Sequence, residues 1–82
     1  MTYRGTTIND ALDVTPISQT TWRVSDPRED GSSRGILGYI HETADGFEML
    51  WMRPRAGVTR RYGDFAEAVH ATARQLQTLR RG

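Results

Sequence analysis

The chain has 82 residues, of which 37% are hydrophobic and 26% are charged, and its formal net charge is +1. This length leaves room for a single hydrophobic core, so the sequence predicts one domain over residues 1–82 and excludes a second. Cysteine is absent, which excludes disulfides, thiolate metal sites and thiol catalysis.

Residues 1–19 form an N-terminal segment in which apolar side chains are sparse. Ile8 and Leu12 stand four residues apart, a spacing that allows one helical turn. Thr7 could cap that turn, and Pro16 would end it.

The sheet region, residues 20–62, begins with a strand. Over Thr20–Ser25 the side chains alternate, with Trp22 and Val24 pointing to the same side. The segment that follows, Asp26–Ser33, holds only charged and turn-forming residues. This composition predicts a mobile loop.

Two further strands form a predicted hairpin. The sequence predicts strands over Gly35–Glu42 and Phe47–Met52, and Asp45-Gly46 supplies the residues that a tight turn between them needs. Beyond a turn, Val58–Tyr62 could add a short edge strand. The predicted antiparallel sheet is therefore three-stranded, or four-stranded if this edge strand forms.

The final predicted element is a helix over residues 64–80. Asp64 and Glu67 stand three residues apart at its start, which is the spacing of a capping box. Apolar residues then recur at intervals of three and four, as one continuous helix face requires. This face consists of Phe65, Ala68, Val69, Thr72, Ala73, Leu76 and Leu79. We expect an α+β fold in which the antiparallel sheet packs against this C-terminal helix.

Both faces of the predicted sheet carry large side chains. The face toward the helix is predicted to consist of Trp22, Val24, Ile36, Ile40, Phe47, Met49 and Trp51. The other face is predicted to present Leu37, Tyr39, Leu50 and Met52.

An apolar patch of this size, if exposed, usually marks an interface. We therefore expect the second face to bind another copy of the chain, forming a homodimer, or to bind a protein partner. The alternative is that the N-terminal segment folds back over this face with its apolar side chains Ile8, Leu12, Val14 and Ile17.

None of the residue patterns that carry catalysis occurs in the sequence. Gly35 and Gly38 lie in a predicted strand and lack the lysine and helix of a phosphate-binding loop. His41 and His70 do not have the spacing of metal ligands. The acidic residues of Asp26–Asp30 lack the alternating ligand positions of a calcium loop. We expect a protein that is not an enzyme and that needs neither cofactor nor metal.

The sequence gives no sign of export or of membrane insertion. No apolar run approaches the length of about 18 residues that a spanning helix needs. A secretory signal and a lipidation motif are also missing. We expect a cytoplasmic protein with no membrane partner.

An arginine-rich turn offers a second kind of surface. It comprises Arg53, Arg55, Arg60 and Arg61, with Tyr62 beside them. Arginine can pair with phosphate through two parallel hydrogen bonds, and an adjacent aromatic ring can stack on a base. A nucleic-acid-binding module that uses this turn is the alternative prediction. It is the less favoured one, because the chain as a whole is close to neutral.

Features spread over residues 35–76 also carry a family resemblance. This stretch opens with a Gly-Ile-x-Gly strand, continues with Asp45-Gly46 before the aromatic Phe47, and enters its helix through Gly63-x-Phe65. In these features it resembles the AP2-like arm-binding domains of phage and bacterial tyrosine integrases.

In that family the sheet lies in the DNA major groove. The resemblance therefore implies that the arginines of the turn would lie near phosphates, and these are Arg53, Arg55, Arg60 and Arg61. The strand around Trp22 and the acidic side chains of Glu42, Asp45 and Glu48 depart from the family pattern.

Over most of its length the chain also resembles small uncharacterised proteins of high-GC actinobacteria and their phages. The segments that carry this resemblance are Trp22-Arg23-Val24-Ser25-Asp26, Leu37-Gly38-Tyr39-Ile40 and Phe65–Ala68. It implies the same fold plan and brings no function.

The two functional predictions differ in the variants that would disrupt them. Tyr39→Asp should prevent association through the sheet face. Arg60→Ala combined with Arg61→Ala should abolish nucleic-acid binding together with its dependence on salt.

Overall fold

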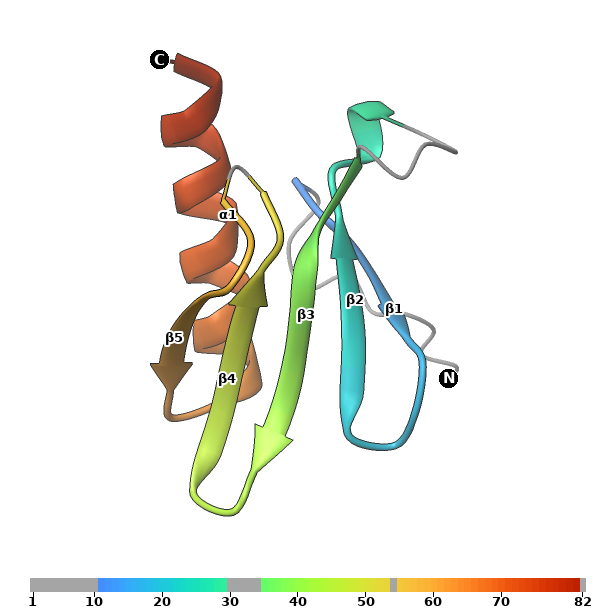
Figure 1. Ribbon diagram of the computed structural model, residues 1–82, viewed down its shortest axis with the longest axis vertical. Helices are drawn as coiled ribbons and strands as arrows, with labels where there is room; N and C mark the ends of the chain where they lie inside the picture. The colour runs from blue at the N-terminus through green and yellow to red at the C-terminus, as the bar shows by residue number, and fades with distance from the viewer. Residues whose placement is uncertain (1–10, 30–34, 54, 82) are drawn as a thin grey trace.

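Five antiparallel strands form one sheet in chain order, and a C-terminal helix packs on it (Figure 1). The computed structural model describes residues 11–29, 35–53 and 55–81. The elements are β1 (Asp13–Pro16), β2 (Thr21–Ser25), the short 3₁₀ turn η1 (Pro27–Glu29), β3 (Ile36–Thr43), β4 (Gly46–Trp51), β5 (Val58–Tyr62) and α1 (Phe65–Arg81). The predicted α+β class, with one C-terminal helix on an antiparallel sheet, is confirmed in this small single domain.

The predicted strand number was wrong, because β1 adds a fifth strand at the edge beside β2. In this pair Val14 lies opposite Val24, and Pro16 lies opposite Trp22. Only Val14 is buried among the four residues of β1, so the alternation is too short to be recognised in the sequence. Proline is tolerated at the end of an edge strand, where its missing N–H removes no interior ladder bond.

Of the predicted helical turn before β1, only its end near Leu12 falls within the described residues. Leu12 lies in the bend that precedes β1, and its side chain is fully buried. The other two residues of the predicted turn, Thr7 and Ile8, lie outside the described residues. Of the predicted loop Asp26–Ser33, the described part forms η1, in which the Arg28 N–H donates a hydrogen bond to Asp26 Oδ1 at 2.9 Å.

The face of the sheet toward α1, here called the inner face, holds the core. The strand registers align Trp22, Ile40 and Met49 across β2, β3 and β4. The buried core consists of Leu12, Val14, Val24, Leu37, Ile40, Met49, Trp51, Ala68, Val69, Ala73 and Leu76. Trp22, Phe47 and Phe65 pack against it, with ring centroids 4.7 to 6.1 Å apart. The predicted helix face and most of the predicted sheet core are therefore confirmed.

A bulge in β3 places Leu37 in the core, where the sequence predicted Ile36. Val24 lies opposite Gly38, but the next residue, Ser25, lies opposite Ile36. Leu37 is therefore an extra residue that the ladder does not pair, which shifts the alternation at this end of the strand. Strict alternation had placed Ile36 in the core. In the structure Ile36 is half-buried, whereas Leu37 is 5% exposed and belongs to the core.

The predicted capping box starts α1. The Glu67 N–H donates to Asp64 Oδ1 at 2.7 Å, and the Gly63 N–H donates to Glu67 Oε1 at 3.0 Å. Thr72, the buried polar residue on the inner side of the helix, donates its hydroxyl hydrogen to the carbonyl oxygen of Ala68 at 2.8 Å. The helix can therefore bury one side against the sheet without leaving that hydroxyl unpaired.

Over the described residues, no helix has both the length and the apolar character that crossing a bilayer requires.

Candidate interaction surface

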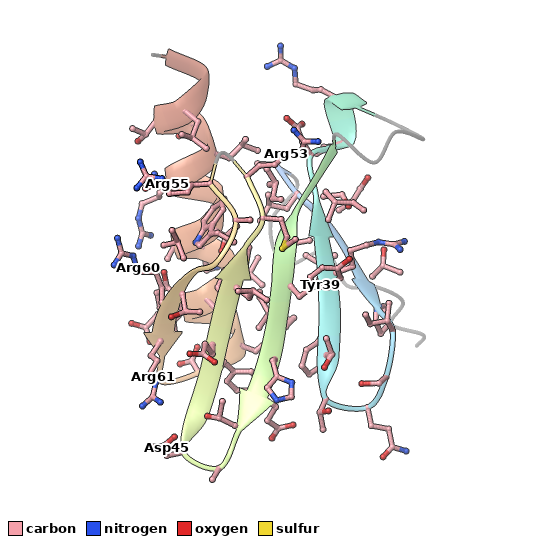
Figure 2. The ribbon with its side chains drawn as sticks, viewed as in Figure 1. Tyr39, Asp45, Arg53, Arg55, Arg60 and Arg61 are labelled. Carbon is pink, nitrogen blue, oxygen red and sulfur yellow. The ribbon has the colours of Figure 1, made fainter. Side chains whose placement is uncertain are left out.

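The face of the sheet away from α1, here called the outer face, has a layout set by the strand registers. Its middle row runs across the sheet through Thr15, Arg23, Tyr39, Leu50 and Thr59. A neighbouring row runs through Thr21, His41, Glu48 and Arg61. Tyr39 belongs to the central strand and to the middle row, so it lies near the centre of this face (Figure 2).

Several apolar side chains gather on the outer face. Leu50 is 38% exposed and Met52 is 41% exposed, while Tyr39, opposite Leu50 on β3, is half-buried. Leu37, which the sequence placed in this group, lies in the core instead. The bulge in β3 puts the half-buried Ile36 opposite Ser25 on this side. We call the resulting group the outer patch: Ile36, Tyr39, Leu50 and Met52.

The N-terminal segment does not cover the outer patch with its described residues. Leu12 and Val14 are buried in the core. Ile17, in the turn between β1 and β2, is 51% exposed. Ile8 lies outside the described residues. The described side chains Leu12, Val14 and Ile17 therefore do not fold back over the outer face as the alternative predicted.

The charges on the strands of the outer face balance. Two arginines, Arg23 and Arg61, share it with two carboxylates, Asp13 and Glu48. Glu48 lies directly opposite Arg61 on the neighbouring strand. His41 joins this row through a 3.1 Å hydrogen bond between its Nδ1 and Thr21 Oγ1. The outer face is therefore polar at its margins but carries no net charge from its Asp, Glu and Arg residues.

The arginines of the predicted nucleic-acid surface do not share one face. Arg60 lies opposite Met49 and hence on the inner side of β5, whereas Arg61 lies opposite Glu48 on the outer side. Arg53 follows the far end of β4, where its N–H donates to the carbonyl oxygen of Leu37 at 3.3 Å.

Figure 2 shows this separation directly. Arg53 and Arg61 lie near opposite ends of the β4–β5 hairpin, and Arg55 and Arg60 lie beside the helix. Tyr62, the aromatic residue of the predicted site, lies opposite Phe47 and packs on the core from the inner side. The sequence analysis grouped these side chains as one arginine-rich turn. Because Val58–Tyr62 forms a strand, the consecutive residues Arg60 and Arg61 point to opposite faces.

Within residues 11–29, 35–53 and 55–81, no group of three or more His, Asp or Glu side chains is close enough to hold a metal ion. The outer patch and a pocket beside Arg60 are two surfaces of the described chain that could receive another molecule.

Comparison with protein-family models, curated proteins and solved structures gives no significant match.

Proposed function

We propose that this chain is a non-enzymatic binding module that works as a homodimer, with the outer faces of two copies packed against each other. The observation that supports this proposal best is the exposure of Leu50 and Met52 beside Tyr39. These side chains lie on a sheet face that carries no helix, while the inner face already buries the core. Removing apolar surface from water contributes about 25 cal/mol per Å², so a second face would stabilise both copies.

The charges of the outer face favour a second copy over a charged partner. A surface that carries arginines and carboxylates in equal number does not repel itself. Such a surface would exert little long-range electrostatic attraction on a strongly acidic or basic ligand. In a two-fold arrangement, Arg61 and Glu48 of one copy could pair with residues of opposite charge on the other copy.

The size of the face indicates how strong the dimer should be. Five strands about 4.8 Å apart, with a rise of about 3.3 Å per residue, give a face on the order of 500 Å² per copy. This area is at the lower end of specific interfaces, where transient assemblies are found. We therefore expect a dimer that dissociates on dilution into the micromolar range.

Symmetry makes Tyr39 the most informative position. A two-fold axis that passes through the centre of an isologous interface brings the residues near the axis against their own copies. Tyr39 is the central residue of the outer face, so it should lie next to Tyr39 of the second copy.

The first experiment measures molar mass by light scattering over a hundredfold range of concentration, at low and at high salt. The expected result is a mass that rises to twice the monomer with concentration and persists in high salt, because the interface is mainly apolar. Tyr39→Asp should give a monomer at every concentration. Gln77→Asp, an equal change of charge at an exposed position of α1, should leave the dimer intact. A wild-type chain that stays monomeric throughout overturns the proposal.

A crosslinking experiment tests the arrangement itself. The chain contains no cysteine, so Tyr39→Cys introduces a single thiol. Facing sheets lie about 10 Å apart, which is beyond the reach of a disulfide, so a short bis-maleimide is the appropriate reagent. It should link Tyr39→Cys chains into dimers and leave Thr78→Cys chains, whose thiol lies on α1, as monomers. Equal crosslinking of both variants would rule out a face-to-face dimer.

The nucleic-acid alternative is tested on the same samples. A duplex DNA of mixed sequence is titrated against the wild-type chain at low and high salt. Binding that is lost in Arg60→Ala with Arg61→Ala, and retained in Tyr39→Asp, would support the alternative in place of the homodimer.

A further inference from the structure

A pocket between the edge strand β5 and α1 lies apart from the outer face. It is partly open to solvent and has a volume of about 230 Å³. Its apolar lining comes from Trp51 at the end of β4, from Val58 and Tyr62 on β5, and from Ala71 on α1. Trp51 is only 6% exposed, and the other three are half-buried, so they provide a partly enclosed apolar wall. The remaining lining is polar and exposed.

Two arginines supply the charge of this pocket. Arg60 reaches it from the inner side of β5, and Arg55 reaches it from the loop between β4 and β5. Figure 2 shows both labels at the β5 edge of the sheet, next to α1 in this view. The exposed side chain of Gln75 completes the lining from α1.

The guanidinium groups of Arg55 and Arg60 are unpaired within the described part of the chain. Neither makes a hydrogen bond or an ion pair with a described residue, and none of the residues that line the pocket is acidic. A guanidinium binds a carboxylate or a phosphate through parallel, charge-assisted hydrogen bonds. Two guanidinium groups line this pocket, and no carboxylate of the protein lines it with them. The pocket is therefore suited to binding an anionic ligand.

Gly57, two residues after Arg55, has a defined backbone conformation. Gly57 adopts a φ of +93°, a backbone conformation that residues other than glycine rarely adopt. Its N–H donates a hydrogen bond to the carbonyl oxygen of Trp51 at 2.9 Å. This bond ties the loop back to the strand that contributes the apolar wall. The end of the loop beyond Arg55 is therefore attached to the strand that contributes Trp51.

We propose that this pocket binds a small organic anion. Its carboxylate or phosphate pairs with Arg55 and Arg60, and its flat apolar portion lies against Trp51 and Tyr62. The volume of the pocket suits a molecule with a single ring rather than a nucleotide or a larger cofactor. This site does not depend on the homodimer, because it lies on the other side of the sheet from the outer patch.

The test uses ¹⁵N-labelled wild-type chain and four probes: benzoate, phenyl phosphate, inorganic phosphate and benzyl alcohol. Benzoate or phenyl phosphate should produce saturable shifts of the amide resonances of Val58, Ala71 and Gln75. The amides of the outer face, such as that of Tyr39, should not move. The relative affinity of benzoate and phenyl phosphate then identifies which anionic group the site prefers. Inorganic phosphate and benzyl alcohol, each of which lacks one half of the ligand, should bind at least about tenfold more weakly.

Two neighbouring residues on β5 provide the matched variants. Arg60→Gln should lower the affinity for the tighter-binding of benzoate and phenyl phosphate by at least about tenfold, since it removes one of the two guanidinium groups. Arg61→Gln, the same change one residue along and on the outer side, should leave the affinity unchanged. The proposal is overturned if no probe gives saturable shifts, if benzyl alcohol binds as tightly as benzoate, or if the two variants behave alike.

Discussion

Neighbouring residues of β4 lie in two different environments. Met49 points to the inner face and has no exposed surface, while Leu50 points to the outer face and is 38% exposed. The same contrast holds along β3, where Ile40 is fully buried and His41 is exposed. The inner face makes the contacts that stabilise the domain. On the outer face Leu50 and Met52 remain largely in water, and the proposed homodimer would account for apolar residues there.

The largest expected effect is a difference in unfolding free energy between alanine variants of two neighbouring residues, one on each face. Met49→Ala should lower the free energy of unfolding by about 3 kcal/mol, because it leaves a cavity in a closed core. Leu50→Ala should lower it by less than about 1 kcal/mol, since much of that side chain is already in water. Urea denaturation at a concentration where the chain is monomeric measures both. Equal losses would mean that the outer face is covered in the monomer.

A smaller effect is expected at Gly38, the glycine of the inner face. A Cβ built there would clash with the backbone carbonyl oxygen of Leu50 and would lie 2.8 Å from Met49 Cε. The carbonyl cannot move without disturbing the β3–β4 ladder, so Gly38→Ala should cost about 2 kcal/mol of unfolding free energy. Gly63→Ala is the control, because a Cβ there would lie 3.6 Å from Glu67 Oε1, an ordinary contact. A neutral Gly38→Ala would show that the inner face can relax at this point.

The smallest effect concerns the helix that covers the inner face. Asp64→Ala removes the acceptor for the Glu67 N–H and should lower the free energy of unfolding by about 1 kcal/mol. Asp64→Asn should retain most of the stability, since asparagine caps a helix about as well as aspartate does. Thermal unfolding followed by circular dichroism compares the two variants. If both lose the same amount, the cap contributes through its charge and not through its hydrogen bond.

The sequence predicted β2, β3, β4 and α1 close to their observed bounds, because each has a clear period or a recognisable cap. It offered β5 only as an optional edge strand. Thr20–Ser25 was predicted where β2 covers Thr21–Ser25, and residues 64–80 were predicted where α1 covers Phe65–Arg81. The strand β1 was not predicted from the sequence, because Val14 is its single buried residue. A pattern of period two needs more than one buried position to be recognised.

The candidate surfaces were predicted less completely, and the reasons are geometric. A bulge is a property of two paired strands, so the sequence of β3 alone could not show that Leu37 turns into the core and leaves Ile36 outside. The pocket beside Arg60 depends on how α1 lies over β5, which no periodicity encodes. Tyr39, Leu50 and Met52 could be grouped from the sequence because their alternation is uninterrupted by the bulge.

The two edges of the sheet have a consequence for aggregation. A free edge can recruit further strands and start a fibre, and proteins guard against this with short edge strands, prolines and charges. At one edge, β1 is only four residues long and ends in Pro16. At the other edge, β5 carries two consecutive arginines, Arg60 on its inner side and Arg61 on its outer side. Growth by strand addition is disfavoured at both ends, so an assembly made through the flat face would close at two copies and would not extend into an open polymer.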